Sequence, residues 1–149
     1  MTILLDTSVL GRLANRSDKS HSVAQTAIAE LHRRGEVLAV TAQNLIEFRN
    51  FATRPTAVNG LGLTAVAASS LAATFELSFP LLEETPAVYP AWRALVEALG
   101  VIGKQVHDAR LVAVCHVHSV GQILTFNIGH FTRLVSHGPA VSVIDPVAI

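Results

Sequence analysis

The sequence predicts an α/β fold built around a mainly parallel sheet of four to five strands. Short, branched apolar runs alternate along the chain with longer segments that carry apolar residues at helical spacing. Strands that alternate with helices in this way form a parallel sheet with helices on both faces. The chain has 149 residues, half of them hydrophobic, and this is enough for one core, so we expect a single domain over residues 1–149.

The first part of the chain predicts one strand and two helices. The run "TILLD" (2–6) is short, apolar and branched, as buried strands are, and Ser8 can cap a short helix after it. Residues 22–34 carry apolar side chains three and four positions apart, which predicts a helix. Gly35 ends that helix.

The next elements are a strand and two more helices. The run "EVLAV" (36–40) predicts the second strand. A helix begins at Ala42 and stops before Pro55, because the residue before a proline is disfavoured in the helical region. Thr64 can cap a further helix, rich in small residues, which extends to about Phe75.

The segment after this predicts a third strand and two helices. The run "LSFPLL" (77–82) is interpreted as the strand. Thr85 and Pro86 begin a helix, because proline suits the first helical position, and Gly100 ends it. Residues 106–118 form the helix that follows.

The end of the chain predicts two strands separated by a short helix. The runs "QILTF" (122–126) and "AVSVI" (140–144) are the strands, and the helix begins at Asn127. In parallel sheets of this kind, binding sites form outside the carboxyl ends of the strands, where the strand order reverses.

Charge and cysteine content limit the possible partners and compartment. Lys plus Arg equals Asp plus Glu, at 11 each, so no overall positive field favours nucleic acid, and such a partner has to be argued from a site. Cys115 is the single cysteine, and we expect it in the core of a cytoplasmic protein without disulfides. We find no signal peptide and no apolar stretch long enough for a membrane span.

Four side chains with oxygen atoms are expected at the carboxyl edge of the sheet. Asp6 ends the first strand, and Asn127 follows the fourth. Glu47 lies in the second turn of the helix that leaves the second strand. Asp108 lies at the start of the helix that leads into the fourth strand, and that helix begins above the same edge. We therefore expect these four side chains to converge.

Each of these residues also has a structural interpretation. Asp6 and Asn127 can cap the helices that follow them, and Asp108 can favour a helix N-terminus electrostatically. Glu47 is harder to explain in this way, because it shares its side of the helix with Phe48 and Phe51. A buried carboxylate needs a partner, and no lysine or arginine lies at helical spacing on that side. A hard divalent cation, Mg²⁺ or Mn²⁺, would serve all four oxygen ligands.

Four sequence blocks resemble a known family. The blocks "ILLDTSVL", "NLIEFRNFATRP", "GKQVHDARLVA" and "ILTFNIGHFTRL" are similar, in order and spacing, to those of the PIN-domain ribonucleases, in particular toxins of VapC type. The resemblance extends over essentially the whole chain. It implies a PIN-like three-layer α/β/α sandwich and a Mg²⁺- or Mn²⁺-dependent endoribonuclease. Such toxins are usually homodimers and are usually silenced by a small antitoxin protein.

The resemblance also implies roles for particular residues. Asp6, Glu47 and Asp108 match the acidic positions of the family, and Asn127 stands where an aspartate is frequent. Asparagine keeps an oxygen ligand but no charge, so the number of metal ions, one or two, stays open. Two threonines, Thr7 and Thr125, lie beside these positions, where hydroxyls that orient metal-bound water are common in such families; capping or packing roles are equally open.

Several basic residues lie near the acidic blocks and could hold RNA phosphates. Lys104, in a loop flanked by glycines, is the first candidate, followed by Arg49. The remaining candidates are Arg54, Arg110 and Arg133. Solvated surface cations are the alternative interpretation for most of them.

Three other functions are weighed against the nuclease. A PIN-like module could bind RNA or protein without cutting, because Asn127 weakens the metal site. A phosphotransfer receiver would need an acidic pair on the first strand and an aspartate at the end of the third, and neither is present. A zinc site is disfavoured because the histidines form no H-E-x-x-H motif and paired cysteines are missing.

Overall fold

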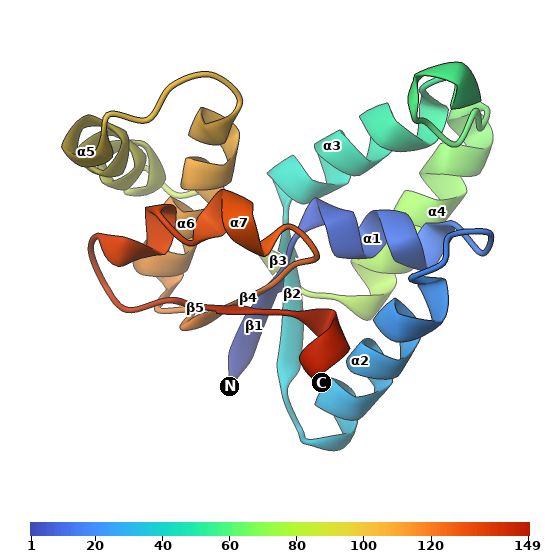
Figure 1. Ribbon diagram of the computed structural model, residues 1–149, viewed down its shortest axis with the longest axis horizontal. Helices are drawn as coiled ribbons and strands as arrows, with labels where there is room; N and C mark the ends of the chain where they lie inside the picture. Colours follow the sequence, from blue (N-terminus) through green and yellow to red (C-terminus); the bar gives the residue numbers. More distant parts are fainter.

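The computed structural model describes residues 1–149 and contains five parallel strands between two layers of helices (Figure 1). The strand order is β3-β2-β1-β4-β5, and every neighbouring pair is parallel. The strands are β1 (Thr2–Leu5), β2 (Val37–Thr41), β3 (Leu81–Leu82), β4 (Gln122–Leu124) and β5 (Ser142–Ile144). The predicted α/β/α sandwich with a parallel sheet is confirmed.

Seven α-helices connect and cover the strands. They are α1 (Thr7–Ala14), α2 (His21–Arg33), α3 (Ala42–Thr53), α4 (Ala65–Ser78), α5 (Val88–Leu99), α6 (Gln105–His118) and α7 (Ile128–Phe131). Three short 3-10 helices span Thr56–Val58, Leu134–Ser136 and Pro146–Ala148. None of the helices combines the length and the apolar character needed to cross a membrane.

The sheet separates two hydrophobic cores, because successive side chains of a strand point to opposite faces. Ile3 and Leu5 of β1 pack into the core beneath α1 to α4. Leu4 lies between them in the sequence and packs into the other core, beneath α5 to α7. Cys115 is buried in this second core, as expected. In Figure 1 the two groups of helices lie on opposite sides of the strands.

The ends of β1 and β4 lie at the point where the order of the strands along the sheet reverses. From β1 the chain continues to β2 and β3 on one side, and it then returns to β4 on the other side of β1. Leu5 of β1 is paired with Leu124 of β4. The residues that follow, Asp6 and Thr125, therefore lie side by side at the switch point, where parallel α/β proteins usually bind ligands.

The third strand is shorter than predicted. The interpretation of 77–82 as a strand is wrong for its first half, because Leu77 and Ser78 complete α4, which the sequence analysis ended near Phe75. Ser78 Oγ donates to the carbonyl oxygen of Thr74 at 2.8 Å, within the last turn of this helix. A short apolar run cannot be assigned to helix or strand from periodicity alone.

Two predicted helix starts also differ. Helix α5 begins at Val88 and not at Pro86, because the residues after Thr85 first form a turn closed by a 3.1 Å bond from Val88 N to Thr85 O. At the first helix, Ser8 is not the cap: Asp6 occupies the N-cap position and accepts from Ser8 N. The helix begins at Thr7, so Asp6 and not Ser8 precedes its first turn.

Candidate active site

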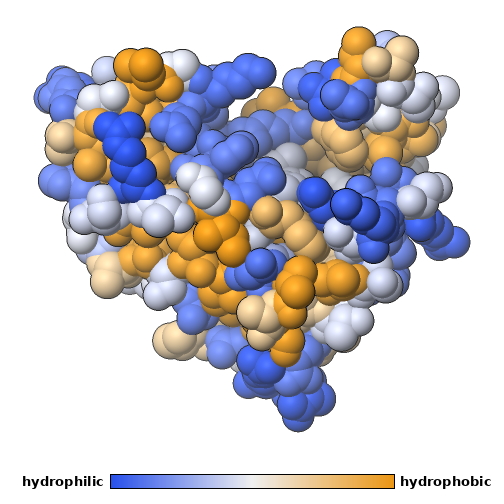
Figure 2. All heavy atoms as spheres, viewed as in Figure 1, coloured by the Kyte–Doolittle hydropathy of each residue, from blue (hydrophilic) through white to orange (hydrophobic).

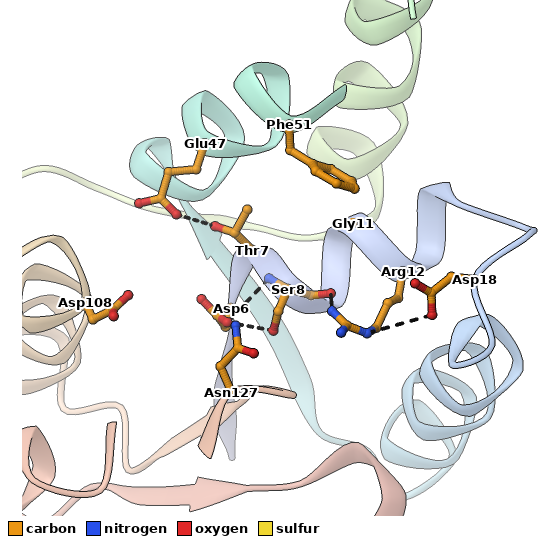
Figure 3. A pocket seen from close by; sticks show the side chains of 10 residues that line it. All are labelled: Asp6, Thr7, Ser8, Gly11, Arg12, Asp18, Glu47, Phe51, Asp108 and Asn127. Atoms are coloured by element: carbon orange, nitrogen blue, oxygen red, sulfur yellow. Dashed lines mark hydrogen bonds and ion pairs between the residues drawn. The ribbon is translucent and has the colours of Figure 1, made fainter. Parts of the chain in front are cut away.

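A cavity of about 390 Å³ lies at the carboxyl ends of β1 and β4. Asp6, Glu47, Asp108 and Asn127 all line it, as Figure 3 shows. The remaining lining residues are Thr7, Ser8, Gly11, Arg12, Asp18 and Phe51. The structure therefore brings the four predicted oxygen-bearing side chains to one cavity from four separate segments of the chain.

Asp6 is the most tightly held of the four. It follows β1 directly, and only 5% of it is exposed. Its Oδ2 atom accepts hydrogen bonds from Ser8 Oγ at 2.7 Å and from Thr125 Oγ1 at 2.8 Å, and a longer one from Ser8 N at 3.4 Å. Its Oδ1 atom takes no hydrogen bond from the protein, and this oxygen is therefore free to bind a ligand.

Glu47 is half-buried and is held by two neutral donors. Thr7 Oγ1 donates to its Oε2 atom at 2.8 Å, and Gln43 Nε2 donates to its Oε1 atom at 2.7 Å. Gln43 is fixed in turn, because its Nε2 also donates to the carbonyl of His107 and its Oε1 accepts from Arg110 at 2.9 Å. The partner that the sequence analysis required for Glu47 therefore includes Gln43, four residues earlier on the same helix.

Asp108 lies in the first turn of α6 and has no hydrogen-bond donor on its carboxylate. The imidazole of His130 lies beside it, with Nδ1 at 3.6 Å from Oδ2. Burial, and then the negative charges of Asp6 and Glu47, raise the pKa of Asp108 to about 6, while His130 and His107 act in the opposite direction. The acids of this cavity thus repel one another.

Asn127 follows β4 and is exposed at the edge of the cavity. Its side chain makes no hydrogen bond and does not cap α7. Its backbone N–H donates to Thr125 Oγ1 at 2.9 Å. Thr125 therefore joins the end of β4 to Asp6 by a hydrogen bond, and Thr7 donates a hydrogen bond to Glu47. Both predicted hydroxyls are thus hydrogen-bonded to acids of the site.

The first two basic candidates, Lys104 and Arg49, lie in different surroundings. Lys104 lines a wider, open cavity that shares Glu47 and Asp108 with the first one. Arg49 instead donates to Ser69 Oγ on the surface and lines neither cavity.

Arg12 lines the acidic cavity and was missed. Its guanidinium lies 4.5 Å from the ring centroid of Phe126, and it donates to the carbonyl of Ser8 at 3.1 Å. Its distance to a carboxylate oxygen of Asp18 is 4.0 Å. Its position in the sequence could have indicated this place, because Arg12 lies one helical turn after Ser8 on the same helix.

The donor set fits a hard divalent cation. The side chains offer oxygen atoms and no thiolate or imidazole at the centre of the cavity. Neither Asp6 nor Glu47 forms an ion pair with a lysine or arginine, so their charge is not neutralised within the protein. No three acidic, histidine or cysteine side chains lie close enough together to hold an ion as they stand.

The fold and the cavity define an α/β protein with an acidic cavity at the switch point of its parallel sheet. The sequence matches the PIN domain family over residues 3–135. The chain therefore belongs to the PIN domain family. No curated protein sequence matches it.

Solved structures agree with the family fold. The structure of VapBC2 from Rickettsia felis bound to a DNA fragment from the promoter contains a chain with a TM-score of 0.71 and 15% identity, covering 97% of this chain and 98% of that one. VapBC-1 from nontypeable Haemophilus influenzae gives a TM-score of 0.66 at 15% identity, covering 98% of both chains. VapC20 from Mycobacterium tuberculosis, a sarcin–ricin loop cleaving toxin, gives 0.56 at 22% identity, covering 81% of this chain and 86% of that one.

Proposed function

We propose that this protein is a Mg²⁺- or Mn²⁺-dependent endoribonuclease that hydrolyses RNA phosphodiester bonds. Asp6, Glu47, Asp108 and Asn127 are the residues proposed to hold the metal. The observation that carries the proposal is the cavity at the switch point, where Asp6, Glu47 and Asp108 meet from three segments and none of them forms an ion pair with a lysine or arginine. The raised pKa of Asp108 supports it, because it reflects burial together with the charges of Asp6 and Glu47.

The bound metal would supply a more acidic water and positive charge where the phosphate gains negative charge during cleavage. The protein's own part is to fix the ligands. Asp6 presents its free Oδ1 because Ser8 and Thr125 occupy Oδ2. Thr7 and Gln43 hold Glu47 in one orientation. We propose one metal ion, because Asn127 adds an oxygen without adding charge, and the three acids would have to move closer together to hold it.

We further propose that the enzyme is the toxin of a toxin–antitoxin pair in the cytoplasm, forms a homodimer and binds a small antitoxin protein. The similarity to VapBC structures supports a protein partner of this kind. Expression of the chain alone should arrest bacterial growth, and a small protein encoded beside the gene should relieve the arrest. Growth arrest by the Asp6→Asn variant at the same expression level would contradict a toxic nuclease.

A second candidate function is a PIN-like module that binds RNA or protein without cutting. The uncharged Asn127 favours it, as does the spacing of the acids, which form no ready-made metal cluster. Metal dependence separates the two functions, because only the nuclease requires the cation for its output.

The test combines a Mn²⁺ titration with two measurements. The proposed nuclease should gain thermal stability with Mn²⁺, by about 2.7 kcal/mol at a hundredfold excess over Kd, and should cut RNA over the same concentration range. Asp108→Asn should remove both effects, while Glu97→Gln on the exposed side of α5 is the control and should remove neither. Stabilisation without cleavage would favour the binding module, and no response to the metal would reject the metal site.

A further inference from the structure

We propose that a nucleobase-binding subsite lies beside the acidic cavity, in a groove between α5 and the start of α6. The inference rests on the proposed ribonuclease function and deepens it, because it gives one base of the RNA a defined place. The groove has a volume of about 460 Å³. Its floor carries the only tyrosine and the only tryptophan of the chain, Tyr89 and Trp92.

The two aromatic rings form a platform with one free side. Their centroids are 5.7 Å apart, with an angle of 28° between the planes, so Tyr89 stacks on Trp92. Trp92 is fixed, because its Nε1 donates to the carbonyl of Val106 at 2.7 Å. Tyr89 is 63% exposed. A fixed stack with an exposed aromatic residue is the type of surface on which unpaired RNA bases bind.

A polar atom in the same groove lacks a partner. Thr85 lines the groove, and its Oγ1 is buried without any hydrogen bond. Buried hydroxyls are almost always hydrogen-bonded, and this atom has no exposed surface in the structure. The edge of a nucleobase on Tyr89, which carries donors and acceptors, would satisfy it only if the Thr85 side chain turned toward the groove.

The charges of the groove favour a neutral ring over a phosphate or an acidic peptide. Arg110 is already engaged by Glu84 in an ion pair and by Gln43 in a hydrogen bond. His107 is the one remaining basic side chain that lines the groove. The formal net charge of the chain is zero, so its affinity for RNA cannot come from an overall positive field, and base stacking would add to the local phosphate contacts.

The groove is continuous with the acidic site. His107 and Arg110 line both the groove and the open cavity that contains Lys104, Glu47 and Asp108. Figure 2 shows the surface hollowed between the α5 and α6 side and the α3 side, with mostly hydrophilic residues at the border. An RNA strand at the acids can therefore pass Lys104 and place a base on Tyr89.

The single tryptophan provides a direct test. In the Asp108→Asn variant with Mg²⁺, where RNA should bind without being cut, a short oligoadenylate should quench the fluorescence of Trp92. The quenching should follow the same binding curve as the anisotropy of a labelled copy of the RNA. In that background Tyr89→Leu should weaken binding by about tenfold, because stacking is lost. Tyr89→Phe should keep the affinity, and Leu77→Ala, at an exposed position of α4, is the matched control.

Cleavage gives a second measurement in the otherwise unchanged protein. Tyr89→Leu should raise KM by about tenfold and leave kcat within about twofold, because the base lies away from the reacting phosphate. The proposed subsite would be rejected if RNA bound without quenching Trp92, or if Tyr89→Leu left the affinity for RNA unchanged. A protein partner would then be the better candidate for the groove. Failure of the unsubstituted chain both to bind and to cut RNA would reject the proposed function together with the subsite.

Discussion

The two walls of the acidic cavity are held very differently. On the wall formed by β1, α1 and α3, Asp6 and Glu47 each accept hydrogen bonds from side chains that are far away in the sequence. On the opposite wall, formed by α6 and the segment after β4, Asp108 has only His130 near it and the side chain of Asn127 has no partner. The carboxylates of the first wall are hydrogen-bonded in the absence of a ligand, whereas the side chains of Asp108 and Asn127 are not, so we expect those two side chains to adjust when a ligand binds.

The carboxylate in the least favourable electrostatic environment is that of Asp108. The charge of Asp6 is stabilised by hydroxyl donors, whereas Asp108 is partly buried beside other negative charges without a donor. Folding therefore keeps a carboxylate on the adjustable wall in an unfavourable state. A bound cation would offset the repulsion on Asp108. The metal-free protein would therefore be less stable than a protein without this carboxylate, in return for metal binding.

The largest effect on RNA cleavage should come from replacing a carboxylate of either wall. Asp6→Asn and Asp108→Asn should each lower metal-dependent RNA cleavage by about a hundredfold or more, because both acids are proposed metal ligands. Rates measured with Mn²⁺ on a labelled RNA would establish this, and circular dichroism would confirm an intact fold. Full activity in either variant would refute the assignment of that residue.

Removing a carboxylate should change the free energy of unfolding differently on the two walls. Asp6→Ala removes the carboxylate that accepts from the hydroxyls of half-buried Ser8 and buried Thr125, and it should cost about 2–3 kcal/mol of unfolding free energy. Asp108→Ala removes a poorly solvated charge and should cost far less or even stabilise the metal-free protein. Urea unfolding in EDTA measures both, and equal losses in the two variants would show that the walls do not differ.

The pH dependence should identify the adjustable wall. Because the pKa of Asp108 is raised from 3.8 to about 6, the folded protein binds more protons than the unfolded chain between pH 4 and 6. The stability of the metal-free protein due to this group therefore falls as pH rises through that window, by about 1–2 kcal/mol after allowance for partial exposure. The difference between the unsubstituted protein and Asp108→Asn isolates this contribution, and a difference that does not change with pH would contradict it.

The smallest effect should come from the support of Glu47. Gln43→Leu removes the donor to Oε1 of Glu47 while Thr7 still holds Oε2. Cleavage should fall by about tenfold and Mn²⁺ affinity should weaken, as is usual for groups that orient a ligand. Gln25→Leu, at an exposed position of α2, is the matched control, and equal rates for the two variants would show that Gln43 does not position Glu47.

The sequence predicted the position of the site because strand ends and helix starts are local features. Asp6 and Asn127 follow apolar runs, and the parallel arrangement then places them at one edge of the sheet. The Gln43–Glu47 pair was also readable, since the two residues are one helical turn apart. It was missed because only charged partners were considered for Glu47.

Contacts between distant segments could not be predicted from spacing. The bond from Thr125 to Asp6 joins residues 119 positions apart, and the bond from Thr7 to Glu47 joins residues 40 apart. The roles of both threonines depend on the register of β1 with β4 and on the packing of α1 against α3. Likewise, the loss of the expected strand at Leu77 depends on how far α4 continues before the buried Phe79.

We propose that the two walls share one cation, and anomalous diffraction from crystals grown with Mn²⁺ would locate it. We expect a manganese peak between Asp6 and Asp108, with Asp108 moved toward the ion and Asp6 almost unchanged. The absence of a peak in the cavity at saturating Mn²⁺, or a peak bound only by residues outside the cavity, would show that the walls share no metal ion.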